Sequence, residues 1–375
     1  MSVLPLMLIA RAGAKLCPRF DYASANAKLR SRVDYASANA RLRSRVDYAS
    51  ANARLRPRVY YSKGSSPFQP FFILAFLLGS SLLLNAQNLY TKTFGDPQNS
   101  AIVFLHGGPG YNCANFEATT ARPLAAAGFF VLVYDRRGEG RSSGEDVAFT
   151  YKETLNDLND LLKKYKIKKA ALIGHSFGGV VATLFARKYP NKVSAVVLAA
   201  SPVVFQETFR TILKKSKSLY QSQKDSINLN YIRLLENMDS KSIEYSSYCF
   251  THAMQNRFYS PKEPTEEAKL IYAAFRADTL LKYASQLTSR APQAFWEHEQ
   301  YTSIDLRPEL EKLLAAKVPV YGIYGKDDGL FSVEQVMELQ NLIGADRLIY
   351  FDQCAHNAFM DQQSAFIEAL RKWVK

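Results

Sequence analysis

Apolar runs alternate with amphipathic stretches along the chain from residue 88 onward. Short apolar runs of strand type recur through this part: AIVFLH, FFVLVYD, KAALIGH, VSAVVLAA, VPVYGIYG and RLIYFDQ. Stretches with apolar residues at helical spacing lie between them, including YKETLNDLNDLLKKY, GGVVATLFARKYP, FSVEQVMELQNLI and QQSAFIEALRKWV. This alternation is typical of βαβ units, so it predicts an α/β fold with a mainly parallel sheet flanked by helices.

The strand pattern is interrupted once, over residues 203–307. This segment is rich in Tyr, and its apolar residues have mostly helical spacing. We therefore predict a helical cap at 203–307, inserted into a core formed by residues 87–202 and 308–375. The chain is long enough to bury such a core.

A tandem repeat of thirteen residues fills much of the segment before this body. Its copies, DYASANAKLRSRV, DYASANARLRSRV and DYASANARLRPRV, begin at Asp21, Asp34 and Asp47. Thirteen residues advance a helix by about 220 degrees, so the few apolar positions never line up on one face. We interpret residues 1–66 as a basic repeat that is disordered or is mistranslated sequence upstream of the real start, rather than as a functional basic arm.

The apolar run FFILAFLLGSSLLLNAQ follows the repeat. Its stretch from Phe71 to Leu84 has the length of a signal-peptide core and is short for a membrane span. We expect residues 67–86 to be a signal peptide cleaved after Ala86, or an uncleaved anchor. The protein is then exported, either periplasmic or secreted, or is membrane-anchored; it is cytoplasmic if the 71–84 run is not used as a signal.

The net charge of +14 is concentrated at one end of the chain. Residues 1–66 contain thirteen Lys and Arg and only three Asp, which leaves a surplus of four positive charges for everything after them. A body so close to balance is not expected to bind nucleic acid. The four cysteines, Cys17, Cys113, Cys249 and Cys354, show no paired spacing, so we expect no metal site.

The motif GHSFGG at residues 174–179 lies between a strand-type run and a helical stretch. A G-x-S-x-G match in this setting indicates a tight turn that lifts the oxygen of Ser176 above the end of the sheet. The helix that follows offers backbone N–H donors at its N-terminus. Small-residue turns are common, so the partners of the serine decide whether it is a nucleophile.

A serine hydroxyl needs a base to remove its proton and a carboxylate to orient that base. His356 lies in DQCAHNAF, beyond the last strand-type run, in a loop expected at the same edge of the sheet as Ser176. The loop GKDDG after the preceding run supplies Asp327 and Asp328. We choose Asp328 as the acid because it stands three residues after Gly325, and Asp327 is the alternative.

Two more glycine-rich motifs follow strand-type runs. HGGPG at residues 106–110 lets backbone N–H groups approach a substrate oxygen, so we expect Gly108 and Phe177 to donate to an oxyanion. The motif DRRGEGRSSG, which begins at Asp135, more often has a structural task, namely tying Asp135 and an Arg into neighbouring loops.

With these motifs in place, the sequence resembles the α/β-hydrolase superfamily over about residues 88–375, and within it the proline iminopeptidase group. The resemblance rests on HGGPG, DRRGEGRSSG, GHSFGG, GKDDG, CAHN and the position of the cap. The chain order Ser176, Asp328, His356 is the order of an α/β-hydrolase triad. The resemblance implies an α/β-hydrolase fold with an eight-stranded sheet and a helical cap, a Ser-Asp-His triad and no cofactor.

The resemblance also implies an activity, release of an N-terminal residue, often proline, from peptides. An aminopeptidase needs acidic groups for the substrate ammonium, and FWEHEQ in the cap combines Trp296 with Glu297 and Glu299, while Glu236 is a further candidate. The sequence departs from the group in His175 and in DRRG where DQRG is usual. The expected function is an aminopeptidase whose substrate is a short peptide or an amino-acid amide. The alternative functions are a carboxylesterase or lactonase, and a non-catalytic binding protein.

Overall fold

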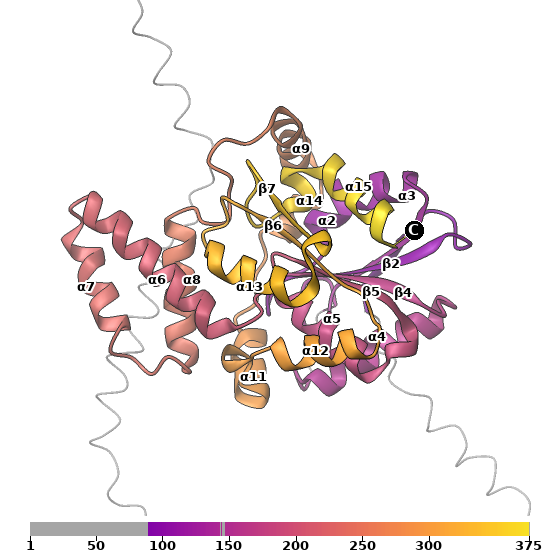
Figure 1. Cartoon of the computed structure of the whole chain (residues 1–375), viewed down its shortest axis with the longest axis horizontal. Coiled ribbons are helices and arrows are strands. Elements are labelled where there is room, and N and C mark those ends of the chain that lie inside the picture. Colours follow the sequence, from indigo (N-terminus) through magenta and orange to yellow (C-terminus); the bar gives the residue numbers. More distant parts are fainter. Residues whose placement is uncertain (1–88, 143, 145–146, 375) are drawn as a thin grey trace, which may run out of the picture. The chain divides into compact units, whose positions relative to one another are not determined.

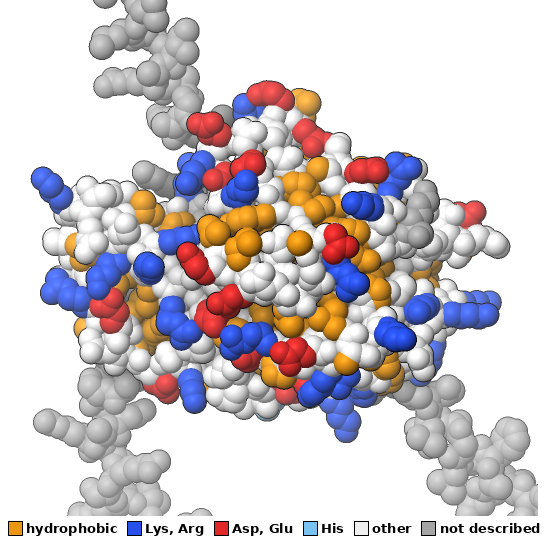
Figure 2. Space-filling model, viewed as in Figure 1, with side chains coloured by type: hydrophobic (Ala, Val, Ile, Leu, Met, Phe, Trp, Pro, Cys, Tyr) orange, Lys and Arg blue, Asp and Glu red, His pale blue; other side chains and the backbone are white. Residues whose placement is uncertain are grey.

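The computed structural model describes residues 89–142, 144 and 147–374. The predictions for residues 1–66 and 67–86 lie outside the described residues. No described helix is both long and apolar enough to cross a bilayer. Lys, Arg, Asp and Glu side chains are interspersed over the face of the body shown in Figure 2.

A seven-stranded sheet forms the centre of the described unit (Figure 1). The strands lie in the order β1-β3-β2-β4-β5-β6-β7, and every neighbouring pair is parallel except β1 and β3. Their bounds are β1 Thr91–Phe94, β2 Ser100–Leu105, β3 Phe129–Tyr134, β4 Ala170–His175, β5 Val193–Ala199, β6 Val320–Gly325 and β7 Leu348–Phe351. The six strands predicted from apolar runs are confirmed as β2 to β7.

The strand count differs from the expectation in two ways. The antiparallel edge strand β1 was not predicted, because its sequence TKTF contains a single large apolar residue and is only partly buried. The eight-stranded sheet implied by the resemblance is wrong for the described residues, which supply seven strands.

The two faces of the sheet carry separate hydrophobic cores. Along β2, Val103 and Leu105 belong to one core, while Ile102 and Phe104 belong to the other, as the two-residue period of a strand requires. All four side chains are fully buried. Because a doubly covered strand has no polar face, the strand-type runs in the sequence are continuously apolar rather than alternating.

Helices cover both faces of this sheet (Figure 1). In chain order they are α2 Ala114–Thr119, α3 Ala121–Ala126, α4 Tyr151–Lys164, α5 Phe177–Lys188, α6 Phe205–Ser222, α7 Ser226–Leu235, α8 Ile243–Gln255, α9 Glu266–Ala277, α10 Leu281–Ala284, α11 Arg290–Glu299, α12 Arg307–Ala315, α13 Val333–Ile343, α14 Ala358–Asp361 and α15 Gln363–Val374. Buried residues of α2, α3 and α15 join one core, and those of α4, α5 and α13 join the other.

The chain between β5 and β6 contains only helices and turns, apart from one isolated bridge between Val204 and Asp305. Helices α6 and α7 form a hairpin that extends away from the sheet, with α8 beside it (Figure 1). Helix α9 instead contacts α14 and α2 of the core. The helical content agrees with the sequence pattern over 203–307, and the role of this insertion as a cap stays a prediction.

Candidate active site

The order of the strands marks one edge of the sheet as the place for a ligand. From β2 the chain moves to β3 on one side and then returns to β4 on the other, so the direction of winding reverses between β2 and β4. In open α/β sheets, ligands bind beyond the carboxyl ends of the strands at such a switch point. The loop after β2 is HGGPG, and the residue after β4 is Ser176.

Ser176 has a strained backbone at this edge. Its φ of 52° and ψ of −124° lie in a region that residues with a side chain rarely occupy. The Ser176 N–H donates to Ala199 O at 2.9 Å, and its carbonyl accepts from Gly179 N at 2.9 Å as α5 begins. These bonds hold the serine in a sharp turn between a buried strand and a buried helix.

The two glycines of the motif are required by close backbone contacts. A Cβ at Gly174 would lie 2.4 Å from Gly179 Cα, and one at Gly178 would lie 2.0 Å from Leu105 O. No side chain fits at either distance. The motif therefore permits α5 to approach β2 and β4 closely enough to form the turn at Ser176.

Asp328 and His356 meet at the same edge, after β6 and β7. His356 Nδ1 donates to Asp328 Oδ2 at 2.8 Å, and Asp328 Oδ1 accepts from Leu330 N at 3.0 Å. Both side chains are buried. Asp327 instead accepts from the backbone N–H of Lys262 at 3.2 Å, so Asp328 is the acid that the structure pairs with His356.

The structure does not join all three predicted residues by hydrogen bonds. Since Nδ1 of His356 holds the proton shared with Asp328, its Nε2 carries a lone pair that can accept a proton. No hydrogen bond between the Ser176 hydroxyl and His356 is formed in the described part of the chain. Such contacts are often long in structures without substrate and tighten when it binds.

His175, the residue before Ser176, connects the end of β4 to the loop that contains His356. Its Nε2 donates to the backbone oxygen of His356 at 3.0 Å, and the two imidazole rings lie 4.9 Å apart in an edge contact. Tyr259 from the helical insertion makes a similar edge contact with His356 at 4.9 Å. His356 is therefore held on three sides, by Asp328, His175 and Tyr259.

We predict that His175 makes the fold sensitive to acid. Burial, with a smaller contribution from His356, lowers the pKa of His175 to about 3. Unfolded His has a pKa near 6.5, so below that pH the unfolded chain binds a proton that the folded chain does not. The contribution of neutral, buried His175 to the free energy of unfolding is complete above pH 6.5. It should fall by about 2 kcal/mol between pH 6.5 and 5.

Urea unfolding at both pH values measures this effect. The variant His175→Gln keeps a side-chain N–H donor but cannot titrate, so it should lose less stability than the wild type on going from pH 6.5 to 5. Equal losses in the two proteins would contradict the assignment to His175.

The HGGPG loop lies directly against Ser176. A Cβ on Gly107 would lie 3.2 Å from Ser176 Cβ, and Gly108 has a φ of +115°, which favours glycine. Phe177 is the first residue of α5, so its N–H has no partner within the helix. The structure thus places Gly108 in the loop against Ser176 and Phe177 at the start of α5, directly after the serine.

The DRRGEGRSSG loop makes the structural contacts that its sequence suggests, and others that it does not. Asp135 accepts from Cys113 N at 2.8 Å and from Arg141 Nε at 2.7 Å, so it ties an Arg into a neighbouring loop as expected. Arg136 and Glu139 were not predicted to have a role. They form a buried ion pair at 2.8 Å against the HGGPG loop.

A second buried carboxylate, Asp361, supports the His356 loop and was also not predicted. It is fully buried and accepts from Ala355 N at 2.8 Å and from Tyr272 Oη at 2.6 Å. Burial raises the pKa of Asp361 to about 6. Because Tyr272 belongs to α9, this carboxylate links the helical insertion to the residue next to His356.

The four acidic and aromatic residues expected to bind substrate have separate surroundings. Trp296 Nε1 donates to Lys241 O at 2.7 Å, Glu236 pairs with a lysine at 2.7 Å, and Glu297 is exposed. Glu299 accepts from the backbone N–H of Tyr151 at 2.7 Å. No two of these residues share a partner among the contacts of the described residues.

Glu299 differs from the other three because its partner reaches the serine turn. The ring of Tyr151 stacks on Phe177, with centroids 6.2 Å apart, and Phe177 directly follows Ser176. The hydroxyl of Tyr151 is buried without a hydrogen-bond partner in the described structure. Among the four predicted residues and their hydrogen-bond partners, Glu299 and Tyr151 therefore lie nearest the turn at Ser176.

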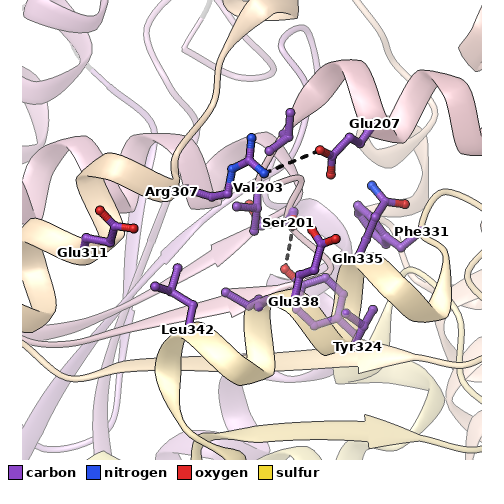
Figure 3. A pocket seen from close by; sticks show the side chains of 13 residues that line it. Ser201, Val203, Glu207, Arg307, Glu311, Tyr324, Phe331, Gln335, Glu338 and Leu342 are labelled. Carbon is purple, nitrogen blue, oxygen red and sulfur yellow. Dashed lines mark hydrogen bonds and ion pairs between the residues drawn. The ribbon is translucent and has the colours of Figure 1, made fainter.

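The walls of the pocket in Figure 3 include neither Glu299 nor Tyr151. Its volume is about 100 Å³, and its walls include Arg307 and Glu207, which form an ion pair at 3.7 Å. None of Ser176, Asp328 and His356 lines it. Small-molecule sites usually have volumes of about 300–1,000 Å³, so we assign no substrate to this pocket.

Metal-ligating groups do not gather anywhere in the described part of the chain. No group of three or more His, Cys, Asp or Glu side chains there could hold an ion. The three described cysteines, Cys113, Cys249 and Cys354, are buried and free.

Comparisons with known proteins agree with the fold. A sequence model described as the alpha/beta hydrolase fold matches residues 100–363. The proline iminopeptidase of Saccharolobus solfataricus is 24% identical over 305 residues, which cover 76% of this chain and 89% of that protein. The pimeloyl-[acyl-carrier protein] methyl ester esterase of Vibrio parahaemolyticus is 27% identical over 296 residues, covering 77% and 98%.

Among solved structures, a proline iminopeptidase-related protein from Thermus thermophilus is similar with a TM-score of 0.53. It is 23% identical, and the match covers 76% of this chain and 94% of that one. At this identity the similarity supports the fold alone.

Proposed function

This chain belongs to the α/β-hydrolase fold family, and we propose that it is a serine hydrolase that forms an acyl-enzyme on Ser176. The family and its peptidase and esterase relatives identify a hydrolase. The observation that carries the serine mechanism is the buried hydrogen bond between His356 and Asp328 at the strand edge that also holds the strained Ser176. A hydroxyl, an imidazole and a carboxylate in this order supply a nucleophile, the base that takes its proton and the acid that orients that base.

The reaction follows from the roles of these groups. His356 Nε2 takes the proton of Ser176 as the serine oxygen attacks a carbonyl carbon, and Asp328 stabilises the imidazolium. The N–H groups of Gly108 and Phe177 hold the negative charge that develops on the carbonyl oxygen. His356 then gives its proton to the leaving amine or alcohol, and in the second half it activates the water that releases the acid.

We propose an N-terminal residue of a short peptide, or an amino-acid amide, as the first substrate class. Such a substrate carries an ammonium close to the scissile bond, which needs a carboxylate near Ser176. Glu299 is our candidate, because its Tyr151 partner stacks on the residue that follows the serine. The relatives named proline iminopeptidases support this class.

A carboxylesterase is the second candidate, with lactones included among its esters. It is favoured by one observation: Glu236 is paired with a lysine and Glu297 is exposed, so the expected cluster of acidic groups around an ammonium does not form. Relatives named as methyl ester esterases match the chain over a similar span. An ester substrate would need the triad and the oxyanion donors alone.

A substrate panel separates these candidates. Proline p-nitroanilide and p-nitrophenyl butyrate are compared in the wild type and in Glu299→Gln, which keeps an acceptor for the Tyr151 N–H. If Glu299 binds the ammonium, KM for the anilide should rise about tenfold or more, as for loss of a charged hydrogen bond, while ester turnover is unchanged.

Glu297→Gln, on the exposed side of the same helix, is the matched control and should behave as the wild type. Turnover of the ester alone, with no effect of Glu299→Gln, would favour the esterase. A folded wild type that turned over neither substrate and was not labelled by a fluorophosphonate would favour a non-catalytic binding protein.

A further inference from the structure

The side chain of Arg136 lies between the loop that follows β2 and the loop that follows β3. It is only 2% exposed, although it carries a permanent charge. Its Nη2 donates to Gly107 O at 2.6 Å, and its Nη1 donates to His106 O. The guanidinium therefore binds two successive carbonyl groups of the HGGPG loop.

The contact with Gly107 O determines the direction of a neighbouring N–H. The peptide between Gly107 and Gly108 is trans, so its C=O and N–H point in opposite directions. With the carbonyl fixed on Arg136, the N–H of Gly108 points away from the guanidinium. A donor on the carbonyl also polarises the peptide, which strengthens the hydrogen bond that its N–H can give.

Glu139 keeps this arrangement in place. It has no exposed surface and binds Arg136 through both oxygens, Oε1 to Nε at 3.2 Å and Oε2 to Nη2 at 2.8 Å. The same Oε2 accepts from Gly110 N at 3.1 Å. The carboxylate thus fixes the far end of the loop and compensates a charge that would be costly to bury alone.

The second expected donor is next to the same side chain. The guanidinium carbon of Arg136 lies 5.3 Å from the centroid of the Phe177 ring. A cation over an aromatic face at this distance is attracted to it. Arg136 therefore binds the peptide that carries the Gly108 N–H and packs against the ring of Phe177, the two residues whose N–H groups face the developing oxyanion in the proposed mechanism.

We propose that Arg136, held by Glu139, is a positioning residue that aims the Gly108 N–H at the oxyanion. The proposal rests on the proposed serine hydrolase function. The charge of Arg136 is also close to the peptide between Gly107 and Gly108, because a Cβ on Gly108 would lie 3.1 Å from Arg136 Nη2. The ion pair acts on the transition state, where the oxygen is charged, more than on the bound substrate.

The test is the double variant Arg136→Gln/Glu139→Gln, which leaves no unpaired buried charge. Its kcat should fall about 10- to 100-fold, in the range for a weakened oxyanion donor, with KM changed less than about threefold. The rate of Ser176 labelling by a fluorophosphonate, whose phosphonyl oxygen occupies the same position, should fall by a similar factor. Kinetics use the panel substrate that the wild type turns over fastest.

The matched control is Arg137→Gln/Asp157→Asn. Arg137 follows Arg136 in the same loop and also pairs with a carboxylate, its Nε donating to Asp157 Oδ2 at 2.8 Å, but none of its hydrogen bonds and ion pairs in the described structure reaches the HGGPG loop. This control should keep kcat and the labelling rate within about twofold, because it leaves the bonds of Arg136 to the HGGPG loop in place.

Three results would overturn the proposal. They are a kcat of the Arg136/Glu139 variant within twofold of the wild type, an increase in KM without loss of kcat, and equal losses in both double variants. Failure of the serine mechanism itself gives a different result, because a folded wild type would then not be labelled at Ser176 at all.

Discussion

Replacing Ser176 with alanine is expected to lower kcat about 10⁶-fold and to abolish labelling by a fluorophosphonate. The acyl-enzyme cannot form without the serine oxygen, and what remains is the small rate enhancement from the oxyanion donors and substrate binding. The strained turn does not depend on the hydroxyl, because the backbone bonds of Ser176 to Ala199 and Gly179 and the two motif glycines maintain it. Circular dichroism and the Tm of the variant should match the wild type.

Ser201 provides a matched control for this experiment. It is also buried, lies just after β5 at the same edge of the sheet, and its hydroxyl has no hydrogen-bond partner in the described structure. Ser201→Ala should keep wild-type kcat and labelling. A Ser176→Ala protein that retained more than about 1% of wild-type kcat would exclude Ser176 as the nucleophile, because residual rates without one are far lower.

The second large effect is expected from Asp328→Asn, which should lower kcat about 10⁴-fold, as for loss of the acid in other triads of this type. The amide can donate to Nδ1 of His356, which favours the tautomer with its proton on Nε2, facing the serine. It also cannot stabilise the imidazolium. Steady-state kinetics with the fastest panel substrate measure the loss. The amide oxygen of the variant can still accept the hydrogen bond from the Leu330 N–H, so the loop should keep its structure.

Asp327→Asn tests the neighbouring carboxylate by the same measurement. Asp327 interacts with Lys262, its Oδ1 lying 3.9 Å from Nζ, and it has no hydrogen bond to His356 among the described residues. Its kcat should stay within about twofold of the wild type, as for an exposed ion pair. A reversal, in which Asp327→Asn is the damaging change, would mean that the acid exchanges during catalysis and that the bond to Asp328 is not the catalytic one.

The strands of the sheet could be predicted because their burial on both faces leaves a continuous apolar run in the sequence. The missed strand β1 shows the limit of that signal. It pairs with β3 on one side only, and its Thr and Lys residues are partly exposed. An edge strand of four residues held by backbone bonds to its neighbour needs little apolar sequence, so only the position of its partner identifies it.

The triad could be predicted because its residues follow strands that end at one edge, so distant motifs had to meet there. Arg136, Glu139 and Asp361 could not be predicted in the same way. A charged residue normally indicates exposure, and these three are buried because partners distant in the sequence reach them, namely the HGGPG loop for Arg136 and Glu139 and Tyr272 of α9 for Asp361. The sequence signals that remained were Arg136, which stands where DQRG has Gln, and Glu139 three residues after it.

The link between Tyr272 and Asp361 has a consequence for protein engineering. The hydroxyl that satisfies Asp361 comes from α9, in the middle of the insertion, while the carboxylate also binds the N–H of Ala355 beside His356. A chimaera that received the whole insertion of another hydrolase would lose the Tyr272 hydroxyl. Its Asp361 carboxylate would then be buried beside the His356 loop without this donor. Grafting is best confined to α6 through α8, with α9 retained as part of the recipient scaffold.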